Sequence, residues 1–229
     1  MQILDANSLS RTIDLANAAA FYGESPSKQK ASQAIAFIAS RFGAANAYAG
    51  TFGITPADER TRLHTFTGEA LTSRASLRHI HAEEACRALI LLQRVAKSRV
   101  PELDAASEKL LACFERAHNQ GTPAGTYCCG PCTVALWRHM ATGGLGAYAQ
   151  KLDQGLRVLS THRRADKGWR RFPFFYTLSV LAEVDLPNAR KEARHHLREC
   201  ERQLASIRRG TETGKRRALV LTQLLERHG

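Results

Sequence analysis

The stretch GTYCCGPCTVALWRHM, residues 125–140, decides the fold, because a glycine is followed six residues later by a proline that opens an apolar run. Residues 168–184, GWRRFPFFYTLSVLAEV, repeat this order with the proline five residues after the glycine. Proline is favoured in the first turn of a helix, so each stretch predicts a helix that begins at its proline. Two such units about 42 residues apart indicate stacked helical hairpins of about 40–45 residues.

Almost all of the remaining chain has the composition and spacing of helices. Alanine, leucine, arginine and glutamine are abundant, and alternating apolar and polar stretches are scarce. We therefore predict an all-α protein of consecutive antiparallel helical hairpins, forming a single domain over residues 1–229. The expected helices cover 8–22, 27–41, 73–97, 102–118, 131–142, 146–164, 174–184, 188–209 and 214–228.

Residues 43–72 are the exception to the helical pattern. Several glycines and the Thr55–Pro56 pair interrupt any helical period there, yet aromatic residues make the stretch too apolar for a disordered linker. We expect an ordered, partly helical excursion that covers one end of the bundle and lines a pocket.

The net charge of the chain is +12 and its isoelectric point is near 9.9. The excess lies in residues 145–229, which hold 18 Lys and Arg against 9 Asp and Glu. Such a surplus favours polyanionic partners, namely nucleic acid, an anionic membrane surface or acidic proteins. It does not bear on the fold.

Targeting signals and disulfide patterns are absent from the sequence. No apolar core of a secretory signal precedes Asp14, and no apolar run approaches the ~18 residues of a membrane span. Six cysteines in 229 residues are too few for a disulfide scaffold, so reduced thiols are expected. These patterns predict a cytoplasmic protein without membrane insertion, and none of them implies a cofactor.

The expected helix 188–209 carries an arginine at every fourth position, beside an apolar face. Side chains four residues apart lie on the same side of a helix, although glutamates in this helix also fit a solvated, partly neutralised face. Our leading hypothesis is a non-catalytic protein whose basic C-terminal face binds a polyanion, with nucleic acid favoured because arginine contacts phosphates. The residues of this face are Arg190, Arg194, Arg198, Arg202, Arg208, Arg209 and Arg216.

The sequence Cys129-Gly130-Pro131-Cys132 matches the active-site dithiol of thioredoxin-like proteins. A cysteine at a helix N-terminus has a lowered pKa because amide N–H groups and the helix dipole stabilise its thiolate. No βαβ pattern precedes the motif, so a thioredoxin fold is not expected. Helical redox proteins that resemble alkylhydroperoxidase D place a histidine four residues after the second cysteine, where this chain has Leu136.

The same cysteines are candidate metal ligands. Cys128, Cys129 and Cys132 could supply thiolates, and His139 lies two turns along the expected helix. Zinc is held by nitrogen and sulfur ligands that commonly come from two short knuckles, and the sequence has no second knuckle. The remaining alternative is that small thiols pack a tight helix start.

The expected helix 73–97 has ionisable residues on its apolar face. His81 and Glu84 fall within that face, whereas His79 and Glu83 form an i,i+4 pair on the other face, where exposure is expected. Buried ionisable groups must be paired or neutralised, so His81 and Glu84 line a polar pocket or belong to an internal network.

Five aromatic residues lie between Trp169 and Tyr176, interleaved with arginines. This mixture suits stacking on nucleic-acid bases, docking of a partner, or a core in which arginine stems pack on rings. The helical spacing of apolar residues from Phe175 onward favours the core.

Residues 125–185 resemble one repeat of the α/α-toroid proteins, which include terpenoid cyclases and the β-subunits of protein prenyltransferases. The resemblance rests on Leu152–Leu159, on Asp166-Lys167-Gly168-Trp169 and on Tyr176-Thr177-Leu178. It implies helical hairpins in which an inner helix follows an acidic-Gly-Trp turn. The aspartate cluster of the cyclases is absent and the prenyltransferase zinc ligands cannot be assigned, so the resemblance implies no catalytic residue.

An α/α-toroid-like or thiol-dependent enzyme is therefore the alternative to polyanion binding. Its candidate catalytic residues are Cys129, Cys132, His81 and Glu84. This alternative requires the four residues, which are distant in sequence, to line one cavity.

Overall fold

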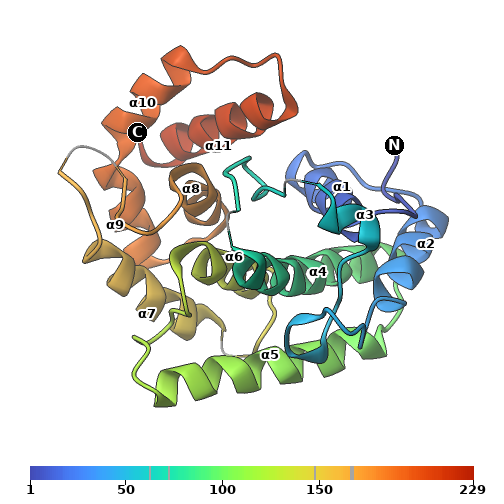
Figure 1. Cartoon of the computed structure of the whole chain (residues 1–229). Helices are drawn as coiled ribbons and strands as arrows, with labels where there is room; N and C mark the ends of the chain where they lie inside the picture. Colours follow the sequence, from blue (N-terminus) through green and yellow to red (C-terminus); the bar gives the residue numbers. More distant parts are fainter. Residues whose placement is uncertain (62, 72, 147, 166–167) are drawn as a thin grey trace.

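Figure 1 shows the computed structural model of the chain, which describes residues 1–61, 63–71, 73–146, 148–165 and 168–229. The predicted all-α fold is confirmed, since 65% of the residues are helical and the described ranges contain isolated bridges but no strand. The elements are α1 (Leu9–Phe21), α2 (Lys28–Ala39), the 3₁₀ turn η1 (Tyr48–Gly50), α3 (Pro56–Glu59), α4 (Arg74–Ala96), α5 (Pro101–Asn119), α6 (Gly130–Ala141), α7 (Tyr148–Ser160), α8 (Phe174–Glu183), α9 (Pro187–His195), α10 (Leu197–Ser206) and α11 (Glu212–His228).

Side-chain caps and prolines begin several of these helices. Ser27 and Thr211 accept hydrogen bonds from first-turn amides of α2 and α11. Pro101, Pro131 and Pro187 occupy the first turns of α5, α6 and α9. The expected helix starts at 102, 131 and 188 are therefore confirmed to within one residue, and Pro173 is the N-cap of α8.

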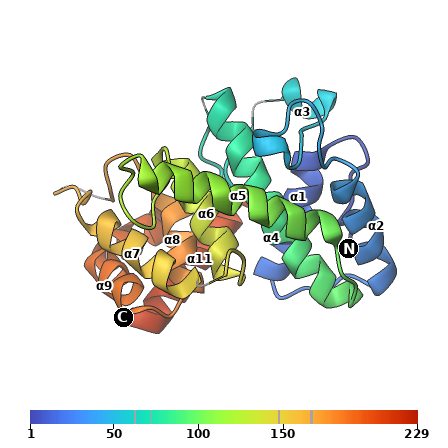
Figure 2. The same ribbon diagram turned by 90° about the horizontal axis from the view of Figure 1, so that it is seen from below.

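Helix α4 lies at the centre of the molecule. It contacts α1, α2, α5, α6 and η1, and Figure 2 views the molecule from the side on which α5 lies. Every residue from His79 to Ile90 is buried, including the charged ones. A helix enclosed in this way has no solvated face, so its ionisable groups need partners inside the protein.

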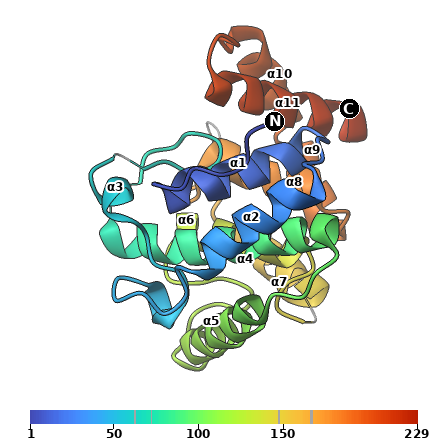
Figure 3. The same cartoon turned by 90° about the vertical axis from the view of Figure 1, so that its right-hand side faces the viewer.

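Helices that follow one another along the chain pair as hairpins. The contacts join α1 with α2, α4 with α5, α6 with α7, α8 with α9 and α10 with α11. Helix α6 contacts α4 as well as α7 and α8, and so connects the N-terminal helices to the C-terminal ones. The α10–α11 pair lies at one end of the molecule, as Figure 3 shows.

The two Gly…Pro segments pack against each other. A Cβ atom at position 130 would lie 1.8 Å from the Arg171 carbonyl oxygen, so only glycine fits there. Trp137 and Phe172 stack with their ring centroids 5.6 Å apart. Arg171 has a left-handed backbone, with φ of 72°, which is uncommon for a residue other than glycine. The start of α6 is thereby held against the turn before α8.

The excursion at 43–72 contains η1 and α3, and Phe66 anchors it to the helices. Two guanidinium groups pack over the Phe66 ring, with Cζ of Arg138 at 4.6 Å and Cζ of Arg216 at 4.2 Å from its centroid. Arg216 Nη1 also donates to the Phe66 carbonyl at 3.0 Å. These contacts explain why a glycine-rich segment is ordered.

The single helix predicted for 188–209 is wrong, because the chain turns at His196 and forms α9 and α10. The His196 backbone has φ of −107° and ψ of 6°, and its ring packs on Trp169 with centroids 4.2 Å apart. Helix α9 packs mainly on α7 and α8 and also touches α11, whereas α10 packs mainly on α11. Because α9 and α10 pack mainly on different helices, tertiary packing interrupts at His196 a helix that the local sequence pattern predicts to be continuous.

Candidate functional site

The three clustered cysteines lie at the N-terminus of α6, opposite the first turn of α4. Cys129 is the N-cap residue of α6, and its Sγ is 3.6 Å from the Ser76 hydroxyl. The Cys132 thiol donates to the Ser76 carbonyl over 3.7 Å. Like the chain's other cysteines, these three are free thiols.

The surroundings move the pKa values of Cys129 and Cys132 in opposite directions. Hydrogen bonds from the Cys128 and Cys132 thiols, from the Cys132 amide and from Ser76 hold the pKa of Cys129 well below its usual range. The sulfur contacts and burial raise the pKa of Cys132. The pKa of Cys128 is also raised, chiefly by its contact with Cys129. Of the three thiols, Cys129 is therefore the one that ionises most readily.

A cavity of about 170 Å³ lies beside Cys128 and Cys129. Thr126, His162 and Arg171 are among its other lining residues, so it offers hydroxyl, imidazole and guanidinium groups. The volume is below the ~300 Å³ at which pockets for drug-sized ligands begin. This cavity suits a small molecule or the tip of a side chain.

His79 lies beside the cysteines and leads away from them to a buried carboxylate. Its Nδ1 is 3.9 Å from Cys128 Sγ, and ligand atoms of His79, Cys128 and Cys132 all lie within 4.8 Å of one another. Its Nε2 is 3.2 Å from Glu83 Oε1, and Glu83 Oε2 is 2.7 Å from His139 Nδ1. His139, a predicted ligand, is therefore linked to the cysteines through Glu83 and His79.

The prediction that His79 and Glu83 are exposed is wrong, although the two residues are paired as expected. Their exposed fractions are 2% and 1%, because α4 has neighbours on several sides. The sequence signal that could have shown this is the set of alanines at 82, 85 and 88, which leaves room for neighbouring helices.

His81, although it is only two residues from His79 in α4, faces α1 and not the cysteines. Its Nε2 is 2.7 Å from the Ser10 hydroxyl and its Nδ1 is 2.7 Å from the Leu77 carbonyl. With Glu84 it lines a cavity of about 60 Å³ that none of the cysteines borders. Among the described residues, His81 and Glu84 therefore line a different cavity from the one beside Cys129, contrary to the expectation that these residues and Cys132 share one cavity.

Glu84 belongs to a buried ion network. Its Oε1 accepts from Arg138 Nε at 2.7 Å and from the Tyr176 hydroxyl, and its Oε2 accepts from Asn17 at 3.0 Å. Arg138 also pairs with Glu183 at 3.1 Å. The network joins α1, α4, α6 and α8, which fits the internal-network alternative for Glu84.

The seven arginines proposed for polyanion binding do not share one environment. Arg216 is buried and its Nη1 is 2.5 Å from Asp14, so it cannot bind phosphate on the surface. Arg190 and Arg202 each pair with a carboxylate. In the described part of the chain no ion pair involves the four remaining side chains, which are exposed: Arg194, Arg198, Arg208 and Arg209.

The aromatic segment at 169–176 belongs to the core. Trp169, Phe172 and Tyr176 are 4%, 9% and 0% exposed. Base stacking and partner docking need accessible rings, so the core interpretation of these three residues is confirmed.

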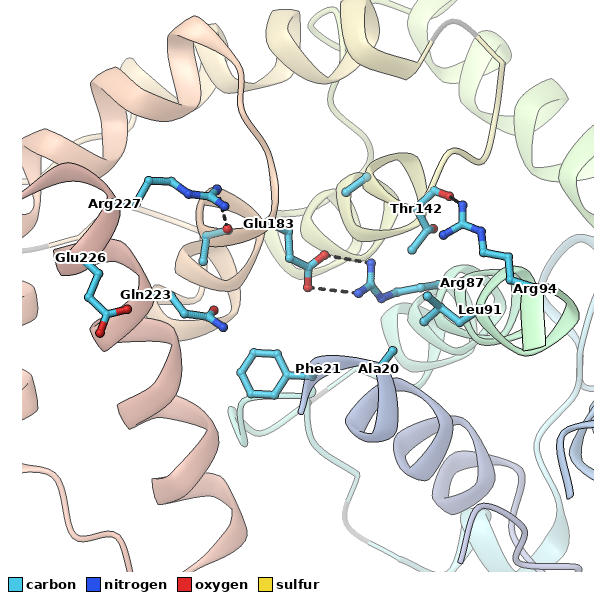
Figure 4. A pocket seen from close by; sticks show the side chains of 12 residues that line it. Ala20, Phe21, Arg87, Leu91, Arg94, Thr142, Glu183, Gln223, Glu226 and Arg227 are labelled. Carbon is cyan, nitrogen blue, oxygen red and sulfur yellow. Dashed lines mark hydrogen bonds and ion pairs between the residues drawn. The ribbon is translucent and has the colours of Figure 1, made fainter. Parts of the chain in front are cut away.

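A larger open cleft of about 680 Å³ is lined by residues of α1, α4, α6, α8 and α11 (Figure 4). Arg87 and Glu183, two of its lining residues, form an ion pair with Nη1 2.9 Å from Oε2. Arg94 and Arg227 donate to backbone carbonyls at the ends of α6 and α8. These four charged groups hold helices together.

Comparison of the chain with protein-family models, with curated proteins and with solved structures finds no match. The resemblance to α/α-toroid repeats stays a prediction, and Asp166 and Lys167 of its turn lie outside the described residues. Among those residues, no helix is long and apolar enough to cross a membrane. A functional assignment therefore depends on the chemistry of the candidate site.

Proposed function

We propose that the protein carries out thiol–disulfide exchange at Cys129 and Cys132. The observation that supports this is the contrast between two thiols three residues apart: the pKa of Cys129 is lowered beside a cavity, and the pKa of the buried Cys132 is raised. The thiolate is the nucleophile in disulfide exchange. A protonated second thiol can then resolve the mixed disulfide after it loses its proton.

The proposed reaction is a two-electron exchange. The Cys129 thiolate attacks one sulfur of a substrate disulfide RSSR, which forms a Cys129–SR bond and releases RS⁻. Cys132 loses its proton and attacks the Cys129 sulfur, which forms the Cys129–Cys132 disulfide and releases the second RS⁻. The protein dithiol is oxidised and the substrate is reduced to two thiols. An external dithiol returns the protein to its starting state.

Trapping of the mixed disulfide tests this function. Metal-free, reduced Cys132→Ser protein is treated with oxidised glutathione, and the modified residue is located by peptide mass spectrometry. We expect a stable mixed disulfide at Cys129, and in the wild-type protein a Cys129–Cys132 disulfide instead. Cys113→Ser, which removes a partly exposed thiol of α5, is the control and should behave as wild type.

Two results would overturn the proposal. One is that Cys129 reacts no faster than Cys113 at mildly acidic pH, where only a thiol of lowered pKa remains ionised. The other is that the wild-type protein forms no disulfide between Cys129 and Cys132.

Polyanion binding is a second candidate function, supported by the net charge of +12 and the exposed, unpaired arginines defined above. Arg194 and Arg198 flank the turn between α9 and α10. We expect the double variant Arg194→Glu/Arg198→Glu to weaken binding of a single-stranded oligonucleotide about tenfold or more and to flatten its salt dependence. Arg60→Glu, at an exposed position far along the chain, is the control. Equal affinities of the two variants for the oligonucleotide would contradict polyanion binding at Arg194 and Arg198.

A further inference from the structure

Glu83 determines which ring nitrogen of His79 is free. An ionised carboxylate only accepts hydrogen bonds, so His79 Nε2 and His139 Nδ1, which face its two oxygens, both carry hydrogens. As a neutral imidazole, His79 then has its lone pair on Nδ1, the atom that faces Cys128. A histidine held by a carboxylate on one nitrogen and free on the other has the arrangement of metal-ligating histidines.

Neighbouring tyrosines hold the His79 ring in this position. Tyr48 of η1 stacks on the ring with centroids 4.3 Å apart, and Tyr127 packs edge-on at the same distance. The two tyrosine hydroxyls are hydrogen-bonded to each other. Cys128 is exposed and Cys132 is buried, so one ligand faces solvent and the others are already oriented. The site is thus rigid on its inner side and accessible at Cys128.

We propose that His79 Nδ1, Cys128 Sγ and Cys132 Sγ bind a divalent metal ion, and that zinc is the ion whose chemistry fits best. The three ligand atoms lie within 4.8 Å of one another. Bonds of about 2.0–2.3 Å to a shared zinc ion bring such atoms slightly closer, which side-chain rotation of the exposed Cys128 can supply. One imidazole and two thiolates form a zinc donor set, and three protein ligands leave the fourth position open.

This inference does not rest on the proposed exchange reaction, although the two share Cys132. A zinc ion binds the deprotonated sulfur of Cys132 and so competes with the Cys129–Cys132 bond. Metal-bound and disulfide forms are therefore mutually exclusive states of one cluster. A variant at His79 tests the metal alone, because Cys128→Ser also removes a hydrogen bond to the Cys129 sulfur. A variant at Cys129 tests the exchange alone.

Titration of the reduced full-length protein with cobalt(II), followed by zinc competition, tests the metal site. We expect one cobalt ion per chain, with thiolate-to-cobalt charge-transfer absorption that zinc abolishes. Cys128→Ser, at an exposed position that leaves the core intact, should lose part of this absorption and bind at least about tenfold more weakly. His79→Gln should bind cobalt similarly weakly, and Glu83→Gln, which replaces the carboxylate that orients His79, about 10–100-fold more weakly.

Two controls define the ligand set. Cys129→Ser, which abolishes the proposed exchange, should retain cobalt binding, and so should His118→Ala on the exposed side of α5. The metal site is refuted if wild-type protein binds cobalt no more tightly than Cys128→Ser. It is also refuted if Cys129→Ser weakens binding as much as Cys128→Ser, because the ligands would then be different ones. Loss of disulfide exchange with retained cobalt binding would remove only the proposed function.

Discussion

At the scale of single residues, Glu83 is a buried carboxylate of the candidate site that is hydrogen-bonded to two histidines, His79 and His139. Burial alone would raise the pKa of Glu83, but hydrogen bonds from His139 and His79 outweigh it and lower the pKa to about 2. The ordinary value is 4.5, so the unfolded chain binds the proton first as the pH falls. Ionised Glu83 therefore contributes stability that is lost as the pH falls from about 4.5 towards 2.

We expect Glu83→Gln to lower the free energy of unfolding by about 3 kcal/mol at neutral pH, because its NH₂ group would face a ring N–H of one histidine. The variant should also lose less stability than wild type between pH 4.5 and 2. Urea unfolding at a series of pH values measures both effects. Glu108→Gln, on the exposed side of α5, is the matched control. Identical acid sensitivity of the two variants would contradict a buried, ionised Glu83.

At the scale of elements, the start of α6 depends on a close backbone contact. Gly130 abuts the Arg171 carbonyl, and the left-handed backbone of Arg171 carries this carbonyl to it. Arg171 also lines the cavity beside Cys129. The helix terminus that lowers the pKa of Cys129 and the wall of its cavity are thus positioned by the same contact.

Gly130→Ala should therefore disturb both stability and the thiol cavity. The added methyl cannot fit 1.8 Å from a carbonyl oxygen, so the turn before α8 must move, at a cost of about 3 kcal/mol. Thermal unfolding gives the stability change, and the alkylation rate of Cys129 reports on the cavity. Gly210→Ala is the control, because a Cβ there meets no neighbouring atom. Similar melting temperatures for both variants would show that the contact is looser than described.

Elements encoded by local chemistry could be predicted from the sequence. Ser27 and the three helix-starting prolines act within one turn, so they mark helix starts without tertiary information. The break at His196 could not be predicted, because its cause is the packing of α9 and α10 on different helices. The burial of His79 is signalled in the sequence only by the alanines at 82, 85 and 88, which leave room for neighbouring helices but do not show which helices fill it.

At the scale of the whole molecule, the first and last long helices are joined by ion pairing. Arg216 of α11 binds Asp14 of α1 through two guanidinium nitrogens, at 2.5 and 3.0 Å, across 202 residues of chain. The same guanidinium packs over Phe66. Local sequence places Arg216 in a basic run, so its burial could not be predicted without its distant partner.

We expect Arg216→Ala to lower the free energy of unfolding by about 3 kcal/mol, because Asp14 then keeps, among the described residues, only the exposed Arg11 as its partner and the Phe66 ring loses a guanidinium packed over it. Urea unfolding measures the loss, and Lys215→Ala, an exposed neighbour, is the control. A double-mutant cycle with Asp14→Ala isolates the ion pair. A coupling energy near zero in that cycle would show that Arg216 stabilises the fold only through Phe66.

The link between Asp14 and Arg216 also has a consequence for biosynthesis. On the ribosome, α1 and Phe66 emerge long before α11, so for most of translation Asp14 and the Phe66 ring lack their contacts with Arg216. A nascent or truncated chain that ends before residue 212 would present Asp14 and the Phe66 ring, without Arg216, to chaperones and proteases. Completion of the last helix is therefore the event that supplies their shared partner.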